Sequence, residues 1–338
     1  MSKQPLNDNR RHLFLTGGTG FFGKALLRFW LARSHGERPE TVTVLTRNPE
    51  RFLNEYPEFA ALGWLRFTRG DVCKPESLPK SAHFTHVLHA AADSTNGGAL
   101  QLLDRFDQIV SGTRNMLRYA VECGAKRFLL TSSGGVYGRQ PADMLKIKED
   151  YCGLPEPLNS ANTYGVAKRA AEHLCALYAN THGLEVVIAR CFAFVGPDLP
   201  LDVHFAIGNF VRDAIEREQI TVSGDGTAIR SYLDQQDLAL WLDTLLNNGL
   251  SGKAYNVGSD RAISIAELAH LVRDLLAPGK PVKILGRAED NNAIRSRYVP
   301  DIDLAKRELG LGVNITLEHS IESTALAAQQ RALKIRQG

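Results

Sequence analysis

Tyr164 and Lys168 lie four residues apart in a segment with helical periodicity, and this spacing places two side chains on one face of a helix. A tyrosine hydroxyl has an ordinary pKa of about 10, so a neighbouring ammonium group is needed to favour the phenolate at neutral pH. Such a pair can exchange a proton with an alcohol or a carbonyl while a nicotinamide cofactor takes or gives a hydride. Lys168 can also hold the ribose of that cofactor. Tyr164 is therefore the candidate acid and base.

By itself this spacing is common, and a core tyrosine beside a solvated lysine is the alternative interpretation. The place of the pair in the chain favours the catalytic one, because it follows an expected strand that ends in Thr131, Ser132 and Ser133. A serine hydroxyl at that point can hydrogen-bond the same carbonyl oxygen as the tyrosine.

A glycine-rich loop joins the first expected strand to the first expected helix. It contains Gly17, Gly20 and Gly23, and read from Gly18 it is also G-x-G-x-x-G. Glycines allow a tight turn and let backbone N–H groups approach a pyrophosphate at the helix N-terminus. Because the loop follows a strand and opens a helix, a dinucleotide site is favoured over a purely structural turn.

The end of the second expected strand indicates which cofactor is preferred. An acidic residue usually binds the ribose 2′-hydroxyl there, but this strand runs into Thr46 and Arg47. Because an arginine is present there and an acidic residue is not, a 2′-phosphate can be accommodated, and we expect NAD(P)(H) as the cofactor with NADP(H) preferred. If Arg47 only covers the adenine, NAD is the alternative cofactor. Asp71 and Val72, after the third strand, are placed to meet the adenine, although an exposed loop aspartate is the alternative.

Strands and helices alternate through the first half of the chain. Short apolar runs rich in Val, Leu and Phe are typical of strands buried on both faces, and stretches of 3.6-residue periodicity separate several of them. The pattern predicts an α/β fold, a Rossmann-like doubly wound parallel sheet. The expected strands are 12–16, 41–46, 64–68, 85–89, 126–131 and 184–190, and the expected helices are 21–32, 102–122 and 163–181.

After Gly196 and Pro197 the pattern loosens into a smaller C-terminal α+β region beside the carboxyl edge of the sheet. We expect a cofactor-binding domain at 1–190 and a substrate-binding domain at 191–338, interleaved with the first. The expected helices here are 205–216, 236–247, 264–276 and 317–333, with short strands at 219–222 and 253–257.

Composition narrows the classes of protein. A chain of 338 residues with 44% hydrophobic and 23% charged residues is globular, and its net charge of +3 is too small for a nucleic-acid-binding surface. The five cysteines are scattered and the ten histidines lack metal-ligand spacing, so we expect reduced thiols and no metal. No apolar run reaches the ~18 residues of a membrane span, and no secretory signal is visible. We expect a cytoplasmic protein without a membrane partner.

Several motifs together resemble the extended short-chain dehydrogenase/reductase family, in its nucleotide-sugar epimerase/dehydratase/reductase branch. The likeness covers nearly the whole chain. Beyond the glycine loop and 164–168, it is carried by Leu130–Gly138, His89–Ala92, Ser223–Gly226, Arg230–Leu233 and Tyr255–Gly258.

The resemblance implies a role for each matching residue. Tyr164 would be the acid and base, Lys168 would set its pKa, and Ser133, three residues before Val136, would donate a hydrogen bond to the substrate. A nucleotide-diphosphate sugar is the implied partner, and helices 102–122 and 163–181 would form a homodimer. The cofactor would be lined by Phe21, Phe22, Ala90 and Ala92. The diphosphate would be held by Arg230 and by either Arg295 or Arg297. The sugar or base would be met by His204 and Asn209, although these two residues could instead belong to a plain helix start.

The sequence departs from the family at positions that matter for mechanism. Members that eliminate water across C5–C6 carry acidic residues where this chain has Gly134 and Gly135. Glycine has no proton to exchange, so 4,6-dehydration and the usual glucuronate decarboxylation lack their acid and base. Ala193 and Ile109 also replace two asparagines of the family pattern, which puts ordinary epimerase contacts in doubt.

We therefore expect an enzyme acting at C4 of a nucleotide-diphosphate sugar. Reduction of an NDP-4-keto-6-deoxy sugar is placed ahead of NAD-dependent C4 epimerisation. A 4,6-dehydratase and a non-catalytic NADP-sensing protein are less favoured, the latter because Tyr164 and Lys168 are both present.

Overall fold

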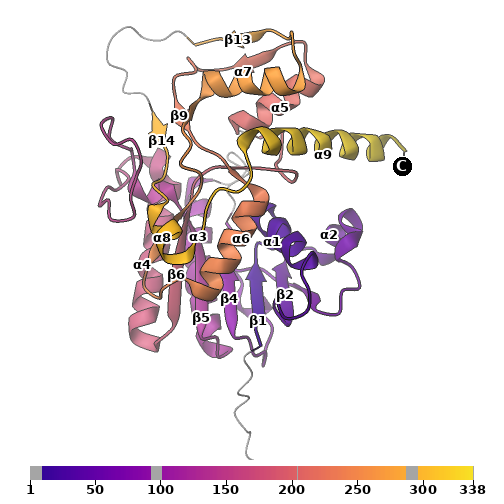
Figure 1. Ribbon diagram of the computed structural model, residues 1–338. Coiled ribbons are helices and arrows are strands. Elements are labelled where there is room, and N and C mark those ends of the chain that lie inside the picture. The colour runs from indigo at the N-terminus through magenta and orange to yellow at the C-terminus, as the bar shows by residue number, and fades with distance from the viewer. Residues whose placement is uncertain (1–9, 93–100, 204, 287–295, 338) are drawn as a thin grey trace, which may run out of the picture.

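A seven-stranded parallel sheet forms the centre of the molecule (Figure 1). The computed structural model describes residues 10–92, 101–203, 205–286 and 296–337. The strand order is β11-β6-β5-β4-β1-β2-β3, so the chain leaves β1 in one direction and returns to its other side at β4. The prediction of a doubly wound Rossmann-like sheet is confirmed. The strands are β1 (His12–Thr16), β2 (Thr41–Thr46), β3 (Leu65–Arg69), β4 (His86–His89), β5 (Arg127–Ser133), β6 (Glu185–Cys191) and β11 (Ala254–Val257).

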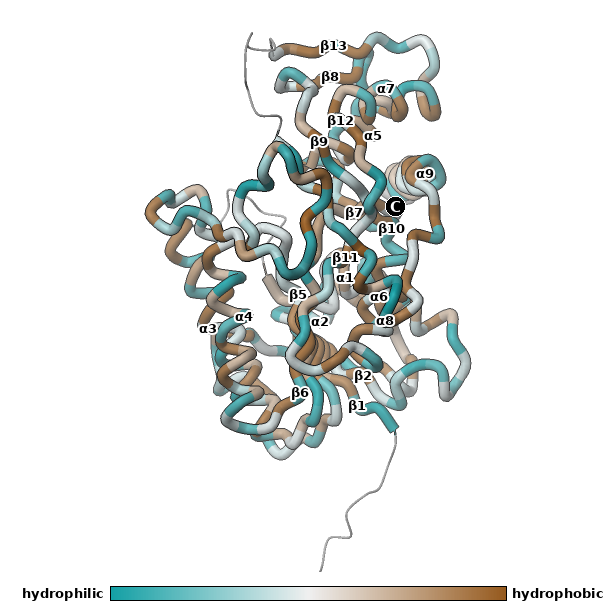
Figure 2. Tube along the Cα trace, turned by 60° about the vertical axis from the view of Figure 1, so that its left-hand side comes forward, coloured by the Kyte–Doolittle hydropathy of each residue, from teal (hydrophilic) through white to brown (hydrophobic). Residues whose placement is uncertain are grey.

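The side chains of β1 show why the sheet is buried on both faces. Leu13 and Leu15 belong to one core and Phe14 to the opposite one, and all three are fully buried. This alternation is the two-residue period of a strand. Helices α1 (Phe21–Leu31) and α6 (Gln235–Asn248) contribute to the first core. Helices α3 (Leu102–Glu122) and α4 (Thr163–His182) contribute to the second and lie side by side (Figure 2).

The strand expected at 253–257 among the C-terminal elements has a different place in the structure. It is β11, which pairs in parallel with β6 and completes the central sheet. Tyr255 and Val257 on this strand are both fully buried in the core of the sheet, which explains the pairing. The chain thus returns to the sheet after leaving it, and the domain division at residue 190 stays a prediction.

A third core lies beyond the carboxyl ends of the strands, in the upper part of Figure 1. Among the described helices, none is long and apolar enough to cross a bilayer. The remaining helices are α2 (Pro49–Glu55), α5 (Ala206–Glu216), α7 (Ile265–Leu276), α8 (Asp303–Leu309) and α9 (Leu317–Gln337). The remaining strands are β7 (Phe194–Val195), β8 (Ile220–Val222), β9 (Ile229–Arg230), β10 (Leu233–Asp234), β12 (Ile263–Ser264), β13 (Val282–Ile284) and β14 (Arg297–Tyr298).

Candidate active site

The glycine loop between β1 and α1 fits only glycine at two of its positions. Gly17 has a φ of +73°, and a Cβ on it would lie 2.4 Å from the Ala90 carbonyl oxygen. A Cβ on Gly23 would lie 2.2 Å from the backbone of Gly18. Gly20 is the N-cap of α1, whose first N–H groups have no partner within the helix. The loop therefore offers a tight backbone cradle with a partial positive charge, which fits a pyrophosphate.

The loop after β4 is fastened directly to this cradle. The Thr16 hydroxyl lies 2.7 Å from His89 Nδ1 and accepts a 3.2 Å hydrogen bond from the Ala91 N–H. The Ala90 N–H donates to the Thr16 carbonyl at 3.2 Å, and the Ala92 N–H donates to the Ala90 carbonyl at 3.1 Å. The structure thus brings Ala90 and Ala92 to the carboxyl ends of β1 and β4. Strand order reverses here, as it does where α/β sheets bind ligands.

Phe21 and Phe22, at the start of α1, are half-buried. The ring of Phe22 meets the ring of Phe194 edge-on at 5.0 Å between centroids. Phe21 packs against both the core of the sheet and the C-terminal core. These aromatic residues therefore join the two parts of the chain beside the glycine cradle.

The ends of β2 and β3 carry the residues expected near the adenosine. Arg47 follows Thr46 and is exposed, and it forms no hydrogen bond or ion pair with any residue in the described part of the chain. Asp71 accepts a 2.9 Å hydrogen bond from the Cys73 N–H, which closes a turn, and Val72 is buried. A guanidinium in this position can bind an anion without breaking an existing contact.

The structure brings Ser133, Tyr164 and Lys168 together where β5 ends and α4 begins. Lys168 Nζ lies 5.8 Å from the centroid of the Tyr164 ring and donates a 2.7 Å hydrogen bond to the Thr131 carbonyl. The Ser133 hydroxyl interacts with the Tyr164 hydroxyl, and its oxygen accepts a 3.1 Å hydrogen bond from the Gly135 N–H. The hydroxyl hydrogen of Ser133 therefore has the freedom to donate to a substrate oxygen.

Ser132, the other serine at the end of β5, is committed elsewhere. Its hydroxyl donates a 2.5 Å hydrogen bond to Glu172, which is also held by Arg190 at 2.8 Å. This pairing leaves Ser133 as the serine at the Tyr164 hydroxyl.

Burial shifts both titratable groups. It lowers the pKa of the Lys168 ammonium to about 8. It raises the pKa of the Tyr164 hydroxyl, and the nearby Tyr298 and Cys191 raise it further, while Ser133 and Arg105 lower it. At neutral pH the site therefore holds a phenol and an ammonium. Arg105, on α3, is a cation near the tyrosine that the sequence did not single out, and the assignment of Lys168 as the group that sets this pKa stays a prediction.

Tyr298 is a second residue of the site that sequence reasoning missed. Its hydroxyl lies 3.5 Å from the Ser133 hydroxyl, and a Cβ added to Gly134 would lie 2.7 Å from it. The same Cβ would lie 2.7 Å from the ring of Phe192. Gly134 and Gly135 were the only signal in the sequence that could have indicated this residue, because a glycine leaves space that a side chain from a distant part of the chain can fill.

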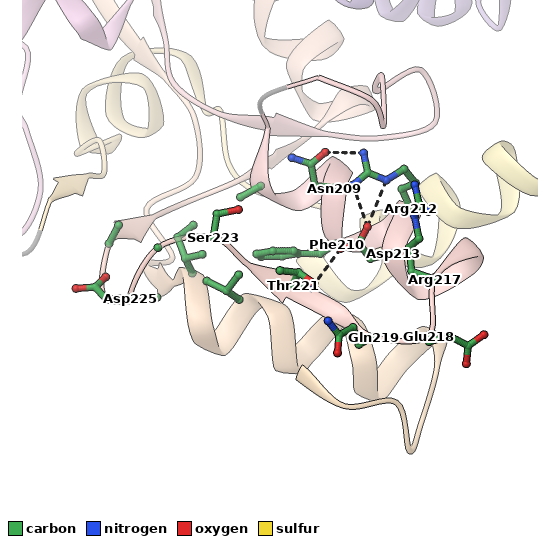
Figure 3. A pocket seen from close by; sticks show the side chains of 16 residues that line it. Asn209, Phe210, Arg212, Asp213, Arg217, Glu218, Gln219, Thr221, Ser223 and Asp225 are labelled. Atoms are coloured by element: carbon green, nitrogen blue, oxygen red, sulfur yellow. Dashed lines mark hydrogen bonds and ion pairs between the residues drawn. The ribbon is translucent and has the colours of Figure 1, made fainter. Parts of the chain in front are cut away.

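A pocket of about 770 Å³ lies in the C-terminal part, between α5 and the loop after β8 (Figure 3). The Asn209 carboxamide oxygen accepts a 3.1 Å hydrogen bond from Arg212. Arg212 also pairs with Asp213 at 2.9 Å, and Asp213 accepts from the Thr221 N–H at 3.2 Å. The glycine-containing loop 223–226 lines the same pocket. Asn209 thus lies in a pocket with a polar, hydrogen-bonded wall.

The other expected substrate contacts have different outcomes. Arg230 lies on β9, directly opposite Tyr298 of β14, and its guanidinium donates to the carbonyls of Ile229 at 2.8 Å and Ser296 at 2.9 Å. His204 and Arg295 lie outside the described residues.

The glycine cradle and the serine–tyrosine–lysine group, placed together at the switch point of a parallel sheet, define an NAD(P)-dependent enzyme. The chain belongs to the NAD-dependent epimerase/dehydratase family, whose model matches residues 13–258. The predicted kinship with the extended short-chain dehydrogenase/reductases that act on nucleotide sugars is confirmed.

Curated relatives and solved structures place the chain among these enzymes. It is 34% identical to UDP-glucuronic acid decarboxylase 6 of Arabidopsis thaliana over 91% of this chain and 86% of the relative. The dTDP-glucose 4,6-dehydratase DesIV of Streptomyces venezuelae, solved with NAD and TYD bound, has a TM-score of 0.80 at 25% identity, covering 94% of this chain and 97% of that one. RMD of Pseudomonas aeruginosa, solved with NADPH, has a TM-score of 0.77 at 26% identity, covering 95% and 99%.

Proposed function

We propose that this protein uses NADPH to reduce the C4 carbonyl of a nucleotide-diphosphate 4-keto-6-deoxy sugar. The observation that carries the proposal is the surroundings of Ser133. Positions 134 and 135 are glycines, and the space beside Gly134 is occupied by Tyr298 and Phe192. No carboxylate can stand at position 134 to remove or return a proton at C5. Ser133, Tyr164 and Lys168 remain, and beside a bound nicotinamide these side chains can support the transfer of a proton and a hydride at a single carbon.

The protonation state of Tyr164 also supports reduction. A phenol whose pKa is raised by burial is a proton donor at neutral pH, and the product of hydride addition to a ketone is an alkoxide that needs that proton. Ser133 would donate a hydrogen bond to the same oxygen, and the Lys168 ammonium would favour negative charge developing there.

The cofactor would lie on the cradle at Gly17 and Gly20, with its 2′-phosphate on Arg47. When bound, the nicotinamide supplies the hydride. The guanidinium of Arg47 is exposed and has no hydrogen-bond or ion-pair partner within the described ranges, so it matches the charge of a 2′-phosphate. This match is the reason for preferring NADP(H) over NAD(H).

The C-terminal part, within residues 191–338, would bind the nucleotide diphosphate. The pocket lined by Asn209 has the polar wall that a nucleoside needs, and Arg230 would hold the diphosphate after exchanging its two backbone acceptors for phosphate oxygens. Homodimerisation through α3 and α4 is part of the proposal, because their outer faces expose Leu103 and Leu177.

Epimerisation at C4 is the alternative chemistry. An epimerase first takes a proton and a hydride from its substrate, the proton on a base and the hydride on the cofactor, and then returns both, so its cofactor ends the cycle unchanged. A tyrosine held as a phenol suits the first step less well than it suits reduction.

The nucleotide carried by freshly purified protein distinguishes the two chemistries. Denaturation followed by mass spectrometry is expected to release little nucleotide, and the emptied protein should bind NADPH more tightly than NADH. Stoichiometric NAD would instead support the epimerase and refute the interpretation of Arg47. Turnover is then measured with dTDP-, GDP- and UDP-linked 4-keto-6-deoxy sugars. UDP-glucuronic acid is included because of the relatives, and we expect no turnover of it, since Gly134 and Gly135 carry no acid.

A further inference from the structure

Three consecutive residues at the end of β5 each contact a different side chain of helix α4. In strand order, the pairs are Thr131 with Lys168, Ser132 with Glu172 and Ser133 with Tyr164. The three helix residues follow one another at intervals of four, the spacing that places side chains on one face of a helix. The face that carries the reacting groups therefore continues to a carboxylate, one helical turn beyond Lys168.

Two neighbouring strands hold the carboxylate of Glu172. Its Oε1 atom accepts a 2.5 Å hydrogen bond from the Ser132 hydroxyl of β5. The guanidinium of Arg190, on β6, donates to Oε2 at 2.8 Å and to Oε1 at 3.1 Å. Only 12% of the Glu172 side chain and 17% of the Arg190 side chain are exposed. A pair with two parallel contacts fixes direction as well as distance, so Glu172 ties α4 to both strands.

Arg190 is in turn held by residues on the far side from α4. Its Nη1 atom donates a 2.9 Å hydrogen bond to the Tyr137 hydroxyl and a 3.1 Å hydrogen bond to the Glu149 carbonyl. The Tyr137 hydroxyl donates a 2.8 Å hydrogen bond to Asn256 of β11. Supporting contacts of this kind fix the orientation of the side chain that they hold. The network therefore defines one position for the Glu172 carboxylate.

The carboxylate of Glu172 also affects the charge of Lys168. The titratable groups around the Lys168 ammonium are Tyr164, Glu172 and Cys175 of α4, His89 of β4 and Cys191 of β6. Burial lowers the pKa of Lys168 to about 8, while Cys191, Glu172 and Cys175 oppose this lowering. Burial raises the pKa of both thiols and lowers that of His89 to about 3, so all three groups are neutral at pH 7. Glu172 is then the anion that favours the ammonium.

We propose that Glu172 is a positioning residue: held by Ser132 and Arg190, its carboxylate keeps α4 against the end of β5 and keeps Lys168 in its ammonium form. The inference rests on the proposed function, because it takes Lys168 and Tyr164 as reacting groups. A neutral lysine would no longer favour the negative charge that develops on the substrate oxygen.

The titration of Lys168 tests the inference without requiring a substrate. In protein labelled with ¹³C at the ε-carbon of lysine, NMR spectra between pH 6 and pH 11 report the pKa of each ammonium, and Lys168→Met identifies the signal. Glu172→Gln keeps the size of the side chain and an acceptor for Ser132 but removes the charge. We expect this variant to lower the pKa of Lys168 by about one unit or more, because an opposite charge nearby is lost.

Arg190→Met is the complementary variant, because it leaves the carboxylate of Glu172 without its cation. The pKa of Lys168 should then rise. Loosened packing would not shift this pKa in opposite directions, and either variant that folds, as circular dichroism shows, carries the test. Glu185→Gln is the matched control, since Glu185 pairs with Arg127 at 2.8 Å at the other end of β6. This control should leave the titration of Lys168 unchanged.

The outcomes separate this inference from the proposed function. An unchanged pKa of Lys168 in Glu172→Gln, or shifts in the same direction in both variants, overturns the inference alone. If the pKa shifts as expected but wild-type protein binds no NADPH in a fluorescence titration, the proposed function fails, while the hold of Glu172 on Lys168 stands. With an active substrate, the alkaline limit of kcat should fall in Glu172→Gln together with the pKa of Lys168, and a limit that does not move overturns the inference.

Discussion

Replacing Lys168 by methionine is expected to stabilise the fold at neutral pH while abolishing activity. Lys168 is 4% exposed, and burial lowers the pKa of its ammonium from 10.5 to about 8. One pKa unit corresponds to about 1.4 kcal/mol, so keeping the charged form buried costs about 3 kcal/mol below pH 8. Methionine has a similar length and no charge, so this cost is removed. The substitution also removes the hydrogen bond from Lys168 to the Thr131 carbonyl, which reduces the gain by about 1 kcal/mol. The net gain in the free energy of unfolding is about 2 kcal/mol.

This gain depends on pH in a defined direction. Between the folded pKa of about 8 and the unfolded value of 10.5, the unfolded chain binds more protons at Lys168 than the folded protein does. The free energy of unfolding of the wild-type protein therefore rises with pH across this window, relative to that of Lys168→Met. The advantage of the variant is largest at pH 7 and disappears towards pH 10.

Urea unfolding of both proteins at pH 7 and pH 10, followed by circular dichroism, measures the effect. Lys24→Met is the matched control, because Lys24 is also buried but pairs with Asp198 at 3.3 Å. Removal of Lys24 leaves a buried carboxylate with one cation fewer, so this control should be less stable than wild type at pH 7. The reasoning would be refuted if Lys168→Met were less stable than wild type at pH 7. It would also be refuted if the free energies of unfolding of the two proteins differed by the same amount at pH 7 and at pH 10.

Three further predictions follow from other contacts. Arg47→Asp should weaken NADPH binding at least about tenfold without weakening NADH binding, since a charge-assisted hydrogen bond is lost; an unchanged ratio in fluorescence titrations would remove Arg47 from the 2′-phosphate. Gly134→Ala should lower the free energy of unfolding by about 1–3 kcal/mol, because its Cβ meets the Phe192 ring at 2.7 Å, and unchanged thermal unfolding would contradict this. Burial opposes ionisation of Asp198, but Lys24 and its neighbours lower its pKa overall, so Asp198→Asn should cost about 3 kcal/mol at pH 7. That cost should shrink only as the pH falls below about 3.8, and urea unfolding at pH 7 and pH 3 would show whether it does.

Features that depend on neighbouring residues could be predicted from the sequence. Helix α3 has the expected bounds, Leu102–Glu122, because its apolar stripe is regular. The glycine cradle could be predicted because only glycine fits at position 17, and a glycine is directly recognisable in the sequence. The grouping of Ser133 with Tyr164 was predicted from their order in the chain, because the strand that ends at Ser133 is followed by the helix that carries Tyr164.

Features that depend on distant contacts could not be predicted in this way. Tyr298 lies on the two-residue strand β14, whose pattern carries no periodicity, and its meaning depends on contacts with β5 and β6. Arg105 acts on Tyr164 through space from another helix. Strand β11 has the same composition whether it pairs in the central sheet or in a smaller one, so only the complete fold determines its partner.

Delivery of hydride to C4 of a nucleotide sugar is tested most directly with NADPH that carries two deuterium atoms at C4 of the nicotinamide, so that the transferred atom is labelled whichever face reacts. With the 4-keto-6-deoxy sugar nucleotide that the protein turns over, each NADPH consumed should place one deuterium at C4 of the product, detected by mass spectrometry and NMR. Tyr164→Phe should slow this transfer by about a hundredfold or more, because the alkoxide loses its proton donor. Sugar conversion without net NADPH consumption, a product without label at C4, or near-wild-type transfer by Tyr164→Phe would contradict the proposed reduction.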